Sequence, residues 1–180
     1  QDTPDAVAIA VTAPGDATEG SSFVFTVTLD TASEQIVTVD FTTTDGTATS
    51  GGDYTSTSGT LTFNPGVLSL TVPVASTDDA VNECDETFDL ALTNPSGVSC
   101  GNVSIGTASD TATIEDTPDA VTIVVAAPGA ASEGNSFVFT VTLDTASDQI
   151  VTVDFATADG TATSAGDYTS TSGTLTFNPG

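Results

Sequence analysis

A long internal repeat constrains the fold of this chain more than any other feature. Residues 2–66 recur without a gap as residues 116–180, an offset of 114 residues, and only 10 of the 65 aligned positions differ. One unit of a solenoid takes about 20–50 residues, whereas a period of this length suits a whole β-sandwich domain. The sequence therefore predicts a complete repeat at residues 1–115 and a truncated second repeat at residues 116–180.

The hydrophobic pattern predicts β-strands along the whole chain. Apolar and polar residues alternate in FVFTVTL, which places Phe23, Phe25, Val27 and Leu29 on one inward face. The same alternation predicts inward residues at 37–41, 61–63, 68–74, 88–92 and 103–114. Pro-Gly and Asp-Gly turn signals separate these runs, and no segment has helical spacing. We expect an all-β fold with about seven strands per repeat, arranged as an antiparallel immunoglobulin-like sandwich.

The charge balance limits the possible partners. The chain has 25 Asp and Glu residues and no Lys, Arg or His. Binding of nucleic-acid phosphates needs Lys or Arg, so a nucleic-acid partner is excluded, and anionic membrane surfaces are disfavoured for the same reason. No apolar run approaches the roughly 18 residues of a membrane-spanning helix. The expected partners are cations, above all divalent ions that take oxygen ligands.

The same composition argues against catalysis. Without His or Lys, a Ser, Thr or Cys nucleophile has no ordinary general base. A pair of carboxylates of the glycosidase kind would need a cleft, usually with aromatic residues that hold the sugar, and the chain has no Trp. We therefore expect a non-enzymatic protein.

Two cysteines bear on the cellular compartment. Cys84 and Cys100 have no His and no further Cys beside them, so a zinc site is not expected. An even cysteine count in a Thr-rich, Lys-free chain favours an exported, extracellular or cell-surface protein with a Cys84–Cys100 disulfide. Free thiols, or pairing between neighbouring chains, are the alternatives.

Four sequence motifs together resemble one known family. They are VTVDF, DGTATSGGDYTSTSGTLTFNPG, TDDAVNECDETFDLALTNPSG and the closing TIED. This combination resembles the Calx-beta domain, which is named from sodium/calcium exchangers and is common in bacterial surface and adhesion proteins. The resemblance covers the whole first repeat and the first half of the second. It implies a seven-stranded antiparallel sandwich that binds Ca²⁺ with carboxylates at one end.

The resemblance also implies a set of calcium ligands. In the first repeat they are Glu19, Asp53, Asp78, Asp79, Glu83, Glu115 and Asp116. In the second repeat Glu133 and Asp167 are the equivalents of Glu19 and Asp53, in a site that is incomplete. The exchanger motif has three consecutive Asp where this chain has Asp78–Asp79–Ala80, which implies fewer ions or weaker binding. The alternative is that these acidic residues are solvated loop ends.

Three functions follow from these observations. The main hypothesis is a structural or adhesive module, in which adjacent repeats joined by the DTPDAV linker form a rod in a cell-surface adhesin or filament, with calcium at the repeat ends. The second is a filament subunit whose truncated repeat is completed by strands of a neighbouring identical chain. The third is a calcium-sensing regulatory domain like those of the exchangers.

Overall fold

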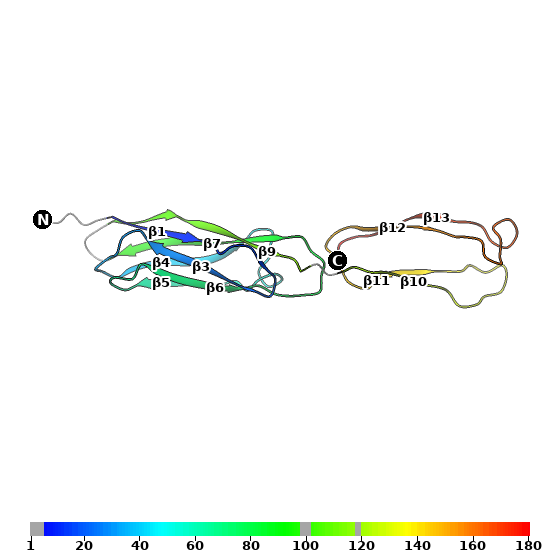
Figure 1. The fold of residues 1–180 in the computed structure, drawn as a ribbon, viewed down its shortest axis with the longest axis horizontal. Helices are drawn as coiled ribbons and strands as arrows, with labels where there is room; N and C mark the ends of the chain where they lie inside the picture. Colours follow the sequence, from blue (N-terminus) through cyan, green and yellow to red (C-terminus); the bar gives the residue numbers. More distant parts are fainter. Residues whose placement is uncertain (1–5, 98–101, 118–119) are drawn as a thin grey trace. The chain divides into compact units, whose positions relative to one another are not determined.

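The computed structural model describes residues 6–97, 102–117 and 120–180 (Figure 1). By its internal contacts the chain divides into two compact units. The first unit comprises Gln1–Asp79 and Asp85–Thr117, and the second comprises Ala80–Cys84 and Pro118–Gly180. Among the described residues no helix has the length and apolarity that a membrane crossing would require. The predicted repeat boundary between residues 115 and 116 stays a prediction.

The first unit is a sandwich of two β-sheets, which confirms the predicted all-β fold. One sheet has the strand order β6-β3-β1-β8 and the other has the order β2-β9-β7-β4-β5 (Figure 1). The strands are β1 (Val7–Thr12), β2 (Ala17–Thr18), β3 (Ser22–Leu29), β4 (Val37–Asp45), β5 (Ser58–Phe63), β6 (Ser69–Ala75), β7 (Glu86–Gly97), β8 (Val103–Thr107) and β9 (Ser109–Glu115).

The first and last strands of this unit differ from the prediction of seven purely antiparallel strands. The chain leaves β1 in one sheet, passes Pro14–Gly15, and enters the other sheet as β2. The last strand crosses between the sheets in the same way, as β8 and then β9. Both segments of the first strand pair in parallel with the last, β1 with β8 and β2 with β9. Because these two strands are each split between sheets, seven expected strands become nine labelled ones.

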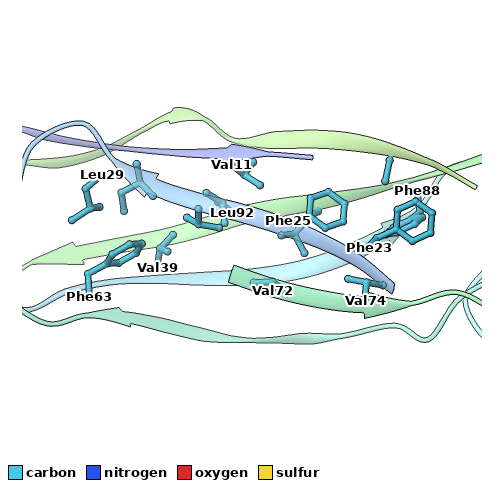
Figure 2. Packing of buried hydrophobic residues seen from close by; sticks show 14 of the residues in the cluster. Val11, Phe23, Phe25, Leu29, Val39, Phe63, Val72, Val74, Phe88 and Leu92 are labelled. Carbon is cyan, nitrogen blue, oxygen red and sulfur yellow. The ribbon is translucent and has the colours of Figure 1, made fainter. Parts of the chain in front are cut away.

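The core of the first unit lies between the two sheets. Phe23, Phe25, Val27 and Leu29 are at most 5% exposed, as the alternating pattern of β3 predicts. Figure 2 shows Phe23 and Phe25 beside Phe88 of β7, with Val72 and Val74 of β6 near them. The ring of Phe88 meets Phe23 and Phe25 edge to face, with centroids 5.5 and 5.7 Å apart. These rings join β3 of one sheet to β7 of the other.

Six residues predicted to face the core depart from full burial. Leu68 is 45% exposed, so that prediction is wrong. It lies just before β6, where its carbonyl accepts a hydrogen bond from Leu29 N at 2.8 Å and the side chain is left outside the sandwich. The other five are only half-buried against the core: Phe41, Leu61, Leu70, Val103 and Ile105. The β4–β7 register shifts between Thr38 and Asp40, which breaks strict alternation before Phe41.

The second unit contains two separate two-stranded sheets. β10 (Ile123–Ala126) pairs with β11 (Thr140–Leu143), and β12 (Val151–Ala156) pairs with β13 (Ser172–Phe177). The registers copy those of the first unit: Ile123 lies opposite Leu143, just as Ile9 lies opposite Leu29. Local pairing in the second copy therefore follows the first copy.

The short segment Ala80–Cys84 contributes to the second unit. Asn82 forms a parallel bridge with Ser147, and Asn82 O accepts hydrogen bonds from Asp148 N at 3.1 Å and Ser147 Oγ at 3.4 Å. Cys84 is an exposed free thiol whose Sγ accepts a hydrogen bond from Gln149 Nε2 at 2.9 Å. The predicted disulfide is therefore not formed at Cys84, because its sulfur faces Gln149 in this unit. Cys100 lies outside the described residues.

Candidate metal site

Glu19 lies where the first and last strands of the first unit leave their sheet. β2 runs parallel to β9 with Thr18 opposite Glu115, and Glu19 N donates to Glu115 O at 3.0 Å. The next amide, Gly20 N, donates to Thr77 O at 3.2 Å, in the segment after β6. The backbone around Glu19 thus joins the exits of three strands at one end of the sandwich.

The Glu19 carboxylate connects the same segments through its side chain. Its Oε1 accepts hydrogen bonds from Thr117 N at 3.0 Å and Thr117 Oγ1 at 2.6 Å, and its Oε2 accepts from Asp79 N at 3.4 Å. Partial burial would by itself raise the pKa of Glu19, but the bonds from Thr117 and Asp79 outweigh it. The pKa of Glu19 therefore lies below its ordinary value of 4.5, so the carboxylate is ionised at neutral pH.

Gly20 lets Asp78 approach this carboxylate-bearing turn. The φ angle of Gly20 is 72°, a left-handed conformation that favours glycine. A Cβ atom at this position would lie 2.9 Å from Asp78 Cβ, closer than ordinary packing allows. The Glu19–Gly20 turn is therefore where Asp78 packs against the exit of β2.

Asp53 reaches the same end from the loop between β4 and β5. Its Oδ2 accepts hydrogen bonds from Thr49 N at 2.6 Å and Thr49 Oγ1 at 2.9 Å, and its carbonyl accepts from Thr77 N at 2.9 Å. One carboxylate oxygen of Asp53 lies within 4.8 Å of one of Glu86, the first residue of β7. At that separation a single cation can contact both groups.

The exit of β9 adds further acidic groups. Glu115 is the last residue of β9 and is exposed, and Asp116 N donates to Asp85 Oδ1 at 3.4 Å. Asp85 and Glu86 were not among the predicted ligands, although both belong to the ECDETF string on which the family resemblance depends. Their position in the sequence could have identified them, because they come three and two residues before the inward-facing Phe88 and so stand at the start of a strand.

Most of the predicted ligands lie at one end of the first unit. Around the end of the first unit the structure brings together Glu19, Asp53, Asp78, Asp79, Glu115 and Asp116, with Asp85 and Glu86 in addition. Glu83 lies in Ala80–Cys84, which belongs to the second unit.

The second copy keeps only the local part of this arrangement. Asp167 Oδ2 accepts from Thr163 N at 2.9 Å and Thr163 Oγ1 at 3.2 Å, as Asp53 does from Thr49. Glu133 is exposed, and no three carboxylates within the described part of the second unit lie close enough to share an ion. The incomplete second site stays a prediction from the sequence.

The donor set at the end of the first unit has a clear chemical character. It consists of carboxylate oxygens and nearby backbone carbonyls, which suit a hard divalent cation that takes six to eight oxygens. Like charges gathered at one end repel one another, and the chain contains no Lys, Arg or His to offset them. A bound cation would remove that repulsion.

Comparison with known proteins agrees with this geometry. The apo form of the Calx CBD1 domain superimposes with a TM-score of 0.52 at 31% identity, covering 60% of this chain and 96% of that one. The calcium binding domain CBD12 of CALX1.1 gives a TM-score of 0.52 at 25% identity, covering 95% of this chain and 70% of that one.

Sequence relatives and the family model point the same way. A stretch of 58 residues, 32% of this chain, is 47% identical to sodium/calcium exchanger 1 of Canis lupus familiaris and of Bos taurus. The chain spans only 6% of the length of these relatives. The family model of the Calx-beta domain matches residues 12–118 and again residues 116–180, and the chain belongs to the Calx-beta domain family.

Proposed function

We propose that the first unit is a calcium-binding, non-catalytic domain whose ion is held at the end where β2, β6 and β9 leave the sandwich. The observation that carries the proposal is the Glu19 carboxylate, which accepts hydrogen bonds from both Asp79 N and Thr117 N. One ionised group thus ties the segment after β6 to the segment after β9. The proposed ligands are Glu19, Asp53, Asp78, Asp79, Glu86, Glu115 and Asp116. The family resemblance alone adds Glu83.

The function we propose for this site is calcium sensing. Binding draws together segments that leave three different strands, so the ion changes the stability and rigidity of this end of the domain. The support is that the similar solved structures are calcium binding domains and that the sequence relatives are sodium/calcium exchangers. The adhesin, the filament and the extracellular location stay predictions from the sequence.

Calcium-dependent unfolding tests the proposal. Free calcium at 100 times its dissociation constant should raise the free energy of unfolding of the first unit by about 2.7 kcal/mol over the chelator-treated protein. Asp53→Asn should abolish most of this rise, because an amide oxygen still accepts from Thr49 but carries no charge.

The matched control is Asp16→Asn, which removes one exposed charge of the same unit at a position where the second copy has Ala130. Asp16→Asn should keep the full calcium response. Equal unfolding curves with calcium and with chelator would contradict the proposal, as would an equal response in the two variants.

A further inference from the structure

We propose that Thr49 and Thr117 are positioning residues of the calcium site, which hold the carboxylates of Asp53 and Glu19 in place before an ion binds. Each threonine donates two hydrogen bonds, one from its backbone N–H and one from its hydroxyl, to a single carboxylate oxygen. We call this arrangement a threonine clamp. The inference rests on the proposed calcium-binding function and adds to it the residues that prepare two of the ligands.

The charge balance explains why the ligands need such clamps. Carboxylates gathered at one end of a domain repel one another, and in most proteins Arg or Lys side chains can offset the repulsion. This chain has 25 Asp and Glu residues and no Lys, Arg or His, so its side chains offer a carboxylate only neutral donors such as hydroxyl and amide groups. Threonine combines a hydroxyl donor with a backbone N–H in one residue.

The Thr49 clamp closes locally, in the loop between β4 and β5. Thr49 N and Oγ1 lie 2.6 and 2.9 Å from Asp53 Oδ2, and Asp53 N donates back to Thr49 O at 3.0 Å. Gly52 leaves room for the hydroxyl, because a Cβ atom at that position would lie 3.1 Å from Thr49 Oγ1. The clamp engages one oxygen of Asp53 and leaves the other available to a cation.

The Thr117 clamp joins segments that are distant in sequence. Thr117 follows the end of β9, and its N and Oγ1 lie 3.0 and 2.6 Å from Oε1 of Glu19, which is 98 positions earlier. Both residues are half-buried. Glu19 Oε2 accepts the longer bond from Asp79 N, at 3.4 Å. The clamp thus fixes Oε1 and leaves Oε2 as the weakly held oxygen, beside the segment that carries Asp79.

The second copy contains a threonine clamp without the surrounding carboxylates. Thr163 N and Oγ1 donate to Asp167 Oδ2 at 2.9 and 3.2 Å, and Asp167 N donates to Thr163 O at 2.9 Å. Within the described residues 120–180 no three carboxylates lie close enough to share an ion. The clamp in this loop therefore forms through local contacts alone, as a ligand held in place before binding requires.

A clamped ligand should bind calcium more tightly than a free one. An ion that meets carboxylates already in position has fewer side chains to order, so less of the favourable interaction is offset by lost conformational entropy. Groups that hydrogen-bond to metal ligands typically contribute about 10–100-fold to metal affinity. We expect each clamp to lie near the lower end of that range, because its backbone N–H remains when the hydroxyl is removed.

Calorimetric titration of the chelator-treated 180-residue chain with calcium tests the inference. Thr49→Val and Thr117→Val keep the side-chain shape but remove the hydroxyl donor, and each should weaken calcium binding about tenfold. Thr49→Ser and Thr117→Ser retain the hydroxyl donor and should keep the affinity of the wild-type chain. Thr163→Val is the matched control in the second copy and should leave calcium binding unchanged.

A purely structural role of the threonines would give a different pattern. The valine variants would then lower the free energy of unfolding in chelator but keep the wild-type dissociation constant for calcium, and the inference would be wrong. Serine variants as weak as the valine variants, or equal effects of Thr49→Val and Thr163→Val, would also overturn it. Thr49 lies in an exposed loop, so Thr49→Val decides the test if Thr117→Val does not fold. An absence of binding heat in the wild-type chain would instead overturn the proposed function, and this inference with it.

Discussion

The two copies in this chain share almost all of their residues but differ in burial. Phe25 is fully buried in the first unit, whereas Phe139 is 56% exposed in the second. The difference arises from β6, β7 and β9 of the first unit, which have no equivalents among the described residues 120–180 of the second. Burial in a β-sandwich is thus a property of strands distant in sequence, and the local apolar pattern only prepares a face for it.

Local hydrogen bonds, in contrast, survive in both copies. Tyr54 OH donates to Asp45 Oδ1 at 2.6 Å, and Tyr168 OH donates to Asp159 Oδ1 at the same distance. Ser50 N and Ser164 N donate to these same two carboxylate oxygens. The loop is built by contacts within ten residues, so it forms without the covering strands.

The largest expected effect comes from truncating the same ring in each copy, which is buried in the first and exposed in the second. Phe25→Ala should lower the free energy of unfolding of the first unit by about 3–5 kcal/mol, because it leaves a cavity beside Phe88. Phe139→Ala should change stability by less than about 0.5 kcal/mol, since the ring is already exposed. Denaturant unfolding of the two variants measures both values, and similar losses would contradict the comparison.

The glycine of the DGTAT loop should show a smaller difference. A Cβ atom at Gly46 would meet the backbone carbonyl oxygen of Thr87, at the start of β7, whereas at Gly160 it would meet nothing within 4 Å. Gly46→Ala should cost about 1–3 kcal/mol through overpacking, and Gly160→Ala less than about 0.5 kcal/mol. Thermal unfolding of the two variants measures this difference in stability. A harmless Gly46→Ala would show that the loop does not need its close approach to β7.

The ionisation of Tyr54 and of its repeat equivalent Tyr168 at alkaline pH gives a third comparison of the two copies. Burial, followed by the bond to Asp45, raises the pKa of Tyr54 to about 12, and the bond to Asp159 raises that of Tyr168. Since the ordinary pKa is 10.0, the folded first unit binds the Tyr54 proton more tightly than the unfolded chain does. The contribution of Tyr54 to the free energy of unfolding is therefore complete below pH 10 and is lost as the pH rises towards 12. Absorbance titration of Tyr54→Phe and Tyr168→Phe assigns each step, and a Tyr54 that ionises first would be the contrary result.

The smallest expected effect is the acid dependence of Glu19. Its lowered pKa means that the folded state favours the carboxylate, so the contribution is complete above about pH 4.5 and is lost as the pH falls through the lower folded value. Glu19→Gln should flatten this part of the stability curve of the calcium-free protein. Acid unfolding curves that coincide with those of the wild-type chain would refute the role of the Thr117 and Asp79 bonds.

The sequence predicts the strands well because their period of two depends only on which face is covered. It predicts Phe23 and Phe25 as core residues, and it predicts Glu19 and Asp79 as neighbours through the family resemblance. It misses the crossing of the first and last strands between sheets, because Pro14–Gly15 gives a turn signal without a direction. It also misses Asp85 and Glu86, since their role depends on where β7 begins relative to the loop that carries Asp53.

The central claim is that the first copy, and not the second, holds calcium through the carboxylate after β2. Calorimetric titration of the chelator-treated chain with calcium tests it most directly, with Glu19→Gln and its repeat equivalent Glu133→Gln as a matched pair. We predict binding heat in the wild-type chain and in Glu133→Gln, and at least about tenfold weaker binding in Glu19→Gln, since ligand charge tunes calcium affinity. An absence of heat in the wild-type chain, or equal binding by the two variants, would contradict the account.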